Sequence, residues 1–381
     1  MYLSNIKIKN HPILGDVEIS LISKATNKPY SIVAFVGENG CGKTTLLNEI
    51  FNYTSSKYIV EKEKDSTFNA LYLRQGSVFS NAMREIHQLI DGNDVYIPNS
   101  NKYFTKHNES SLALINDKQE GAKLVKLFGD EQINKLFEEG RVDDIYCSQD
   151  ISKLISGSNK GYSINNYSSG QQELLLKLRD IRTMSPGTDC VLMDEPETSL
   201  HPRWQLDIVK IVQLMAKDIY GDVPQIFLAT HSEKVLKSLI NNNDTLIVRL
   251  YRENSVVCKE NISEMDLLLP KPTFAELDYV IFKIDTYEYC SELYDFIEQI
   301  TKLKESKVDV IIRNNKSYDD KVHHKEWFNE KYGKITSYNI GTYCRNYFHH
   351  PKDKEEPTPK HLHDAIELLR NVVLDLKQNI K

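Results

Sequence analysis

The stretch from Gly37 to Thr44 has the residue types and the spacing of a phosphate-binding loop. It fits the pattern G-x-x-x-x-G-K-S/T at every required position. Glycines let such a loop turn backbone N–H groups towards phosphate oxygens, and a following helix adds positive potential. We expect Lys43 to contact the β- and γ-phosphates and the Thr44 hydroxyl to bind Mg²⁺. The expected nucleotide-binding residues of the loop are Asn39, Gly40, Cys41, Gly42, Lys43, Thr44 and Thr45.

Two carboxylates follow a second apolar run. Cys190–Met193 has the character of a buried strand, and Asp194 and Glu195 come directly after it. At the carboxyl end of a strand these acids would lie beside the phosphates. We therefore expect Asp194 to hold Mg²⁺ through water and Glu195 to polarise the attacking water. The alternative is a pair of acids that opens an exposed turn, which the upstream phosphate loop disfavours.

Three further stretches could approach the γ-phosphate. Gln75 and His231 each follow a short apolar strand and could reach the γ-phosphate or its water, and Gln75 is also a candidate Mg²⁺ ligand. Ser168, Gly170 and Gln171 lie where a helix is predicted to begin, and the backbone N–H groups and dipole at that point suit an anion. Each of these residues, taken alone, could instead have a purely structural role; Ser168, for example, could only cap the helix.

The order of the predicted elements indicates the fold class. Ser31–Val36, Cys190–Met193 and Gln225–Thr230 have the pattern of buried strands, and predicted helices follow them. This alternation predicts an α/β core with a largely parallel sheet. From about residue 80 to about residue 165, apolar residues recur at helical spacing among charged ones, which predicts a mostly helical insert.

A change in composition near residue 262 predicts a domain boundary. We expect residues 1–261 to form the α/β domain with its insert, and residues 262–381 to form a separate, mainly helical domain. Two helices are predicted there, over Thr342–His350 and His361–Gln378, because a stretch rich in proline and charge separates them. The apolar run Val308–Ile312 fits either a strand or a helix.

Composition excludes some classes of protein. The 381 residues allow two or three domains, and the net charge of −6 provides no global basic field for nucleic acid, although a local patch would suffice. The six cysteines are scattered without metal-binding spacing. We see no N-terminal signal peptide and no apolar run long enough to span a membrane, so we expect a cytoplasmic protein with reduced thiols.

These motifs, in this order, resemble those of the ABC-type ATPase superfamily, a family of P-loop NTPases. The segment from Asp194 to Pro202 is similar to the branch that includes SMC proteins, DNA-repair ATPases and bacterial defence ATPases of the Septu-like or anticodon-nuclease-like kind. The resemblance spans roughly the first 250 residues. It implies ATP and Mg²⁺ as cofactors, Gln75 and His231 beside the γ-phosphate, and a homodimer or higher oligomer formed through the ATPase domain.

In such a dimer each ATP lies between the phosphate loop of one copy and the signature segment of the other. Ser168, Gly170 and Gln171 would then act on the partner's nucleotide, and Ser199 and His201 would lie in the loop that signals across the interface. The signature has Ser169 where the family usually has glycine. The insert is also far too short for the coiled-coil arms of SMC or repair proteins.

A second constellation lies near the C-terminus. Residues 345–350 fit R-N-x-x-x-H, which resembles the HEPN ribonuclease motif, in which arginine and histidine act on the scissile phosphate. Arg345 and His350 are therefore candidate ribonuclease residues, since arginine stabilises phosphate charge and histidine moves protons near neutral pH. The alternative is that Arg345 and the histidines only pair within a helical bundle.

The function that these features favour is a sensor or switch of bacterial defence against phage. Its ATPase would gate a nuclease effector, either the HEPN-like C-terminal domain or a partner subunit. The alternative is a DNA-repair or recombination ATPase that binds DNA ends, which predicts a basic face. A transporter ATPase is disfavoured by the sequence after the two acids and by the long C-terminal extension.

Overall fold

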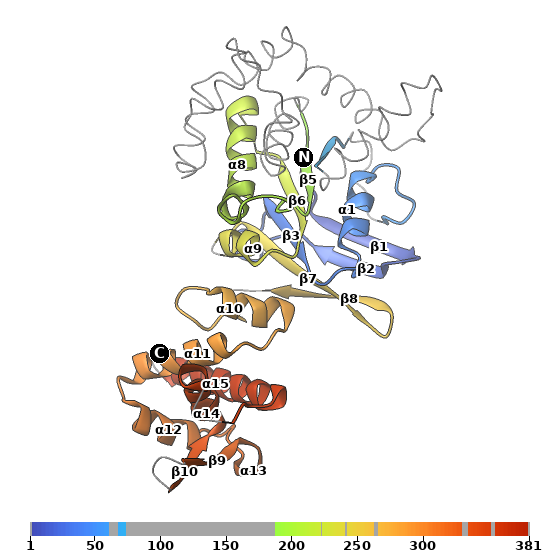
Figure 1. Ribbon diagram of the computed structural model, residues 1–381. Coiled ribbons are helices and arrows are strands. Elements are labelled where there is room, and N and C mark those ends of the chain that lie inside the picture. Colours follow the sequence, from blue (N-terminus) through green and yellow to red (C-terminus); the bar gives the residue numbers. More distant parts are fainter. Residues whose placement is uncertain are drawn as a thin grey trace, which may run out of the picture. The chain divides into compact units, whose positions relative to one another are not determined.

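The computed structural model describes residues 2–60, 68–73, 187–221, 223–240, 242–262, 266–329, 334–351 and 355–379 (Figure 1). The chain divides into two compact units, Met1–Asn261 and Ile262–Lys381. Each unit has its own set of buried apolar side chains. The insert predicted from residue 80 to residue 165 lies outside the described residues.

A six-stranded sheet forms the centre of the first unit (Figure 1). The strand order is β4–β5–β6–β3–β7–β8, and the pairings from β4 through β7 are all parallel. Strands β3, β5 and β6 are buried along their whole length, as expected for parallel strands that are covered on both faces. The predicted α/β fold is therefore confirmed. The strands are β3 (Ile32–Val36), β4 (Ala70–Leu73), β5 (Cys190–Asp194), β6 (Gln225–Thr230), β7 (Thr245–Glu253) and β8 (Val256–Ile262).

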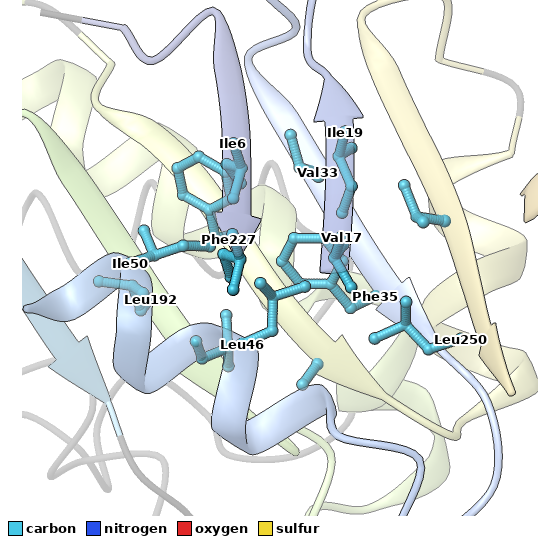
Figure 2. Close-up of a cluster of buried hydrophobic side chains, with 14 of the residues drawn as sticks. Ile6, Val17, Ile19, Val33, Phe35, Leu46, Ile50, Leu192, Phe227 and Leu250 are labelled. Carbon is cyan, nitrogen blue, oxygen red and sulfur yellow. The ribbon is translucent and has the colours of Figure 1, made fainter. Parts of the chain in front are cut away.

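One face of the sheet is covered by helix α1 (Lys43–Phe51) and by the antiparallel pair β1 (Asn5–His11) and β2 (Gly15–Ser20). Figure 2 shows Leu46 and Ile50 of α1 converging on Phe35 and Phe227 of the sheet. The two phenylalanine rings stack with their centroids 6.4 Å apart. This layer fixes α1, and therefore the loop that precedes it, against the ends of the central strands.

Helices α8 (Pro202–Tyr220) and α9 (Glu233–Leu239) pack against each other on the other side of the sheet (Figure 1). They bury apolar side chains such as Ile208, Val212 and Leu236. Helix α8 follows β5 and α9 follows β6, and β5 and β6 are neighbours in the sheet. The loops that lead into the two helices therefore begin side by side at the carboxyl ends of these strands.

The second unit is built mainly from helices and contains one antiparallel hairpin, β9 (His324–Asn329) and β10 (Lys334–Asn339). The hairpin was not predicted from the sequence. The ambiguous run Val308–Ile312 lies in a helix, in which Val308 and Ile312 are buried and Val310 is exposed. The remaining elements are α10 (Phe274–Leu277), a π-helix η3 (Asp278–Phe282), α11 (Tyr287–Thr301), α12 (Glu305–Arg313), α13 (Asp320–His323), α14 (Ile340–His349) and α15 (Pro359–Asn379).

Helices α11, α14 and α15 pack against one another in pairs and form the core of this unit. Tyr289 and Tyr294 of α11 are fully buried, as is Cys344 of α14. Helix α14 approaches α15 closely at Gly341, where a Cβ atom would lie 2.8 Å from Leu369 Cδ2. Among the described helices, none combines the length and apolar character needed to cross a membrane.

Candidate nucleotide site

The phosphate loop joins β3 to α1 and requires glycine at two positions for steric reasons. Gly37 has a φ of 138°, and a Cβ atom there would lie 2.0 Å from the Leu250 carbonyl oxygen of β7. Gly42 has a φ of 101°, and its Cβ atom would lie 2.6 Å from Leu14 Cδ2. The glycines thus allow both the left-handed turns and the close approach of neighbouring elements.

The loop presents a helix N-terminus and a lysine at the position where phosphates would bind. Gly42 is the N-cap of α1 and provides no side-chain cap, so the backbone N–H groups of the first turn are open to an anion. Lys43 is 6% exposed, and its Nζ donates to the carbonyl oxygens of Gly37 at 2.8 Å and Glu38 at 2.9 Å. A triphosphate would offer this ammonium group charged acceptors in place of carbonyls.

The structure brings together two of the three predicted metal ligands, Thr44 and Asp194. The Thr44 hydroxyl donates to Asp194 Oδ1 at 3.1 Å, although the two residues are 150 positions apart. Hydroxyl and carboxylate oxygens at the edge of a phosphate site suit Mg²⁺, which typically takes one or two protein ligands and completes its shell with phosphates and water. The described residues contain no cluster of three or more His, Cys, Asp or Glu side chains suited to a metal.

Glu195 and His231 lie next to each other at the ends of β5 and β6. His231 Nδ1 is 3.5 Å from Glu195 Oε1, and the Glu195 backbone N–H donates to the Ala229 carbonyl oxygen at 2.8 Å. Glu195 has a φ of 45°, so the chain turns sharply as it leaves the strand. The histidine side chain is 51% exposed and the Glu195 side chain 19%. A carboxylate held beside an accessible imidazole is suited to accepting a proton from water.

The other predicted residues of the first unit fall into two groups. Asn39 and Gly40 are exposed at the tip of the loop, Cys41 is buried, and Thr45 is partly buried in α1. The remaining four, namely Gln75, Ser168, Gly170 and Gln171, lie outside the described residues.

The structure adds three residues near the site to which sequence reasoning gave no role. Arg252 of β7 donates from Nε to the Gly40 carbonyl oxygen at 2.9 Å, which ties the loop to β7. Glu197 accepts a hydrogen bond from Thr230 at the end of β6, and Gln205 of α8 donates to the Leu200 carbonyl oxygen. For Glu197, the only signal in the sequence was a third acid close behind the first two.

The C-terminal candidates lie in the second unit, on α14 and at its end. The Arg345 guanidinium lies 3.8 Å from Asp295 Oδ1, and its Cζ is 5.3 Å from the centre of the Tyr294 ring. His350 is exposed and forms the C-cap of the helix. His349, one turn after Arg345, has its Nε2 3.1 Å from the Ser291 hydroxyl of α11. The arginine is therefore seated against α11, whereas His350 extends beyond the last turn of α14.

Residues 62–237 match the protein family described as "AAA domain, putative AbiEii toxin, Type IV TA system". The matched stretch contains the acidic end of β5 and His231, and the phosphate loop precedes it. No curated protein matches the chain in sequence.

Solved structures resemble the chain at low identity. An SMC head bound to the C-terminal winged-helix domain of ScpA is 12% identical over 69% of this chain and 98% of that chain, with a TM-score of 0.35. The cbiO1 protein of the Clostridium perfringens transporter complex cbiONQ is 10% identical over 68% and 88%, with a TM-score of 0.36. The dimeric bacterial ABC transporter cassette MJ0796 is 13% identical over 68% and 96%, with a TM-score of 0.31.

The phosphate loop, the Thr44–Asp194 contact and the adjacent Glu195 provide the groups that triphosphate hydrolysis requires. Together with the similarity of residues 62–237 to an AAA-domain family, they support an ATP-hydrolysing enzyme.

Proposed function

We propose that the chain is an ABC-type ATPase that serves as the ATP-driven switch of a bacterial anti-phage defence system and gates a nuclease effector. One observation carries the hydrolytic part of this proposal. Thr44 and Asp194 meet at 3.1 Å at the mouth of the phosphate loop, and Glu195 lies directly after Asp194. The defence role is supported by the family description, which names a toxin of a type IV toxin–antitoxin system.

In the proposed reaction, the backbone N–H groups of the loop and Lys43 would bind the phosphates, while Thr44 and Asp194 would hold Mg²⁺. A magnesium ion bound there would supply positive charge that offsets the charge of the phosphates. Glu195 accepts a proton from the attacking water as it adds to the γ-phosphorus, and the bond to the β–γ bridging oxygen breaks. His231 lies beside Glu195. From the end of β6 it would orient this carboxylate and reach the γ-phosphate.

A second copy of the chain would complete the site. Thr44 and the loop tip at Asn39 and Gly40 are exposed, and His231 is half exposed. Hydrolysis of a triphosphate is favoured where bulk water is excluded, so another surface must cover these residues during turnover. We propose that the segment Ser168–Gln171 of a partner copy provides this cover, so that ATP binding joins two subunits and hydrolysis separates them.

The second unit is proposed to carry or to recruit the effector. Arg345 and His350 are the residues that an intrinsic ribonuclease of the HEPN type would use, and a second copy would contribute to its site. The Arg345 side chain lies against α11 beside Tyr294 and Asp295, so it would have to exchange this ion pair for the phosphate in such a site. If the unit instead serves as a docking platform, a separate nuclease would bind it and neither residue would be needed for chemistry.

A phage-challenge experiment tests this proposal. Cells that express the chain with its neighbouring genes are expected to resist phage, and Lys43→Ala is expected to abolish resistance because it removes a phosphate contact. Lys28→Ala, which changes an exposed lysine in a turn, is the matched control and should protect. Full protection by Lys43→Ala would refute a role for ATP.

The double variant Arg345→Ala with His350→Ala then separates the two versions of the effector. Loss of protection with unchanged ATP turnover supports the intrinsic nuclease, whereas retained protection supports docking. His363→Ala provides the control, because His363 is an exposed histidine of the same unit that pairs with Asp285.

A further inference from the structure

The loop from residue 196 to residue 201, between β5 and α8, is held from two sides by hydrogen bonds that are buried or partly buried. On one side, Glu197 Oε1 accepts from the Thr230 hydroxyl at 2.7 Å and from the His231 backbone N–H at 3.2 Å. Glu197 is 5% exposed and Thr230 is fully buried. These contacts attach the loop to the end of β6.

On the other side, Gln205 connects the loop to the start of α9. Its Nε2 donates to the Leu200 carbonyl oxygen at 3.0 Å, and its Oε1 accepts from the Ser232 hydroxyl at 3.0 Å. The Ser232 backbone N–H donates in turn to the Thr230 hydroxyl oxygen at 3.0 Å. The hydrogen bonds therefore close a circuit that runs from Glu197 through Thr230, Ser232 and Gln205 back to the loop.

His231 follows Thr230 of this circuit, and its side chain lies beside two carboxylates. Its Nδ1 is 3.5 Å from Glu195 Oε1 and 3.6 Å from Glu197 Oε1. Nδ1 therefore faces both acids, and Nε2 lies on the opposite edge of the ring. The two acids thus flank the side of the imidazole ring that carries Nδ1.

The loop needs such support because its backbone is unusual. Glu195 has a φ of 45° and Ser199 a φ of 63°, in the left-handed region that residues other than glycine disfavour. A strained conformation persists only where surrounding contacts determine it. The circuit supplies such contacts at Glu197, which is bonded to the end of β6, and at Leu200, which is bonded to Gln205.

We propose that Glu197 and Gln205 are positioning residues for ATP hydrolysis. They hold the loop against β6 and α9, and they keep the His231 ring oriented beside Glu195. The inference rests on the hydrolytic roles proposed for Glu195 and His231.

The experiment is a double-mutant cycle measured by steady-state ATP turnover. Glu197→Gln keeps an acceptor oxygen for Thr230 but loses the charge that faces the imidazole, so the chain should still fold. We expect kcat to fall by about 10- to 100-fold with the KM for ATP within about twofold of the original value. The control Glu233→Gln changes a partly exposed acid on the first turn of α9 and should leave kcat unchanged.

Combining Glu197→Gln with His231→Ala distinguishes positioning from a general structural role. If Glu197 acts through His231, the double variant will turn over no more slowly than His231→Ala alone, within about threefold. A product of the two single effects, or an unchanged kcat in Glu197→Gln, would overturn the inference. Gln205→Ala is the second variant and should lower kcat in the same direction without weakening ATP binding.

The same assay separates this inference from the proposed function. If the unaltered chain does not hydrolyse ATP, the proposed function fails and the inference fails with it. If the unaltered chain hydrolyses ATP and the cycle is additive, only the positioning role is refuted.

Discussion

Replacing Glu195 by glutamine is predicted to separate catalysis from folding. The backbone N–H of Glu195 donates to the Ala229 carbonyl oxygen, and this bond does not depend on the side chain. The side chain itself is 3.5 Å from His231, which is half exposed. Ion pairs this exposed contribute about 0–1 kcal/mol, so the melting temperature should change by no more than a few degrees, roughly 2–4 °C.

The effect on turnover should be far larger. Glutamine has the shape of glutamate but cannot accept a proton from water, and loss of a positioned general base typically costs about 10²- to 10⁴-fold. That range corresponds to about 3–5 kcal/mol of transition-state stabilisation. Release of phosphate measured at saturating ATP and Mg²⁺ is the assay, and calorimetry with ATP is the check on binding. A kcat within threefold of the original would refute the assignment of Glu195 as the base.

Three further predictions concern binding and stability. Lys43→Ala removes a charged hydrogen-bond donor worth about 1.5–3 kcal/mol, so calorimetry should show ATP binding at least about tenfold weaker, with Lys28→Ala unchanged. Gly37→Ala places a Cβ atom 2.0 Å from a carbonyl oxygen and should lower the free energy of unfolding by more than Gly15→Ala, where φ is also positive but no atom lies within 4 Å. Burial raises the pKa of the carboxyl of Glu276 in α10. The unfolded chain loses the proton of this carboxyl near about pH 4.3, whereas the folded state keeps it to a higher pH, about as far as its own raised pKa. The free energy of unfolding should therefore fall as the pH rises through the folded pKa. Glu276→Gln should reduce this fall in thermal melts measured between about pH 4 and pH 7. Equal slopes of melting temperature against pH in the two proteins would contradict this.

Local patterns were sufficient to predict the core of the first unit. Strand β3 is apolar throughout and is buried on both faces, so its pattern predicted a central parallel strand. Once Cys190–Asp194 was recognised as another strand of the same sheet, the parallel arrangement placed Asp194 at the same edge as the phosphate loop. The contact between Asp194 and Thr44 across 150 positions follows from that arrangement.

Other features depend on contacts that no local pattern encodes. The role of Glu197 arises from its hydrogen bond to Thr230, 33 positions away, and from the left-handed turn at Glu195. Likewise, the secondary structure of the run Val308–Ile312 was ambiguous. A run of five residues that are apolar except for Asp309 suits either a strand or a helix. It forms a helix whose residues Val308 and Ile312, four apart, share the buried face.

The hairpin β9–β10 was missed because its first strand begins His324-Lys325-Glu326 and lacks a clear alternation of apolar and polar residues. It is held by tertiary contacts instead. Arg313 of α12 donates to the Ser337 hydroxyl of β10 at 3.2 Å, and Asp309 accepts from the Asn339 backbone N–H at 3.1 Å. A two-stranded sheet of this kind requires packing against a helix to be stable, and that packing is not visible in the sequence of the strands alone.

The proposed switch depends most directly on whether a triphosphate joins two copies of the chain. Sedimentation velocity of Glu195→Gln with saturating ATP and Mg²⁺ measures this, because the variant should bind ATP without consuming it. We predict a shift from monomer to dimer when ATP is added, and no shift with ADP or in the Lys43→Ala variant. A Glu195→Gln protein that binds ATP in calorimetry yet sediments as an unchanged species across micromolar concentrations would contradict the proposed switch.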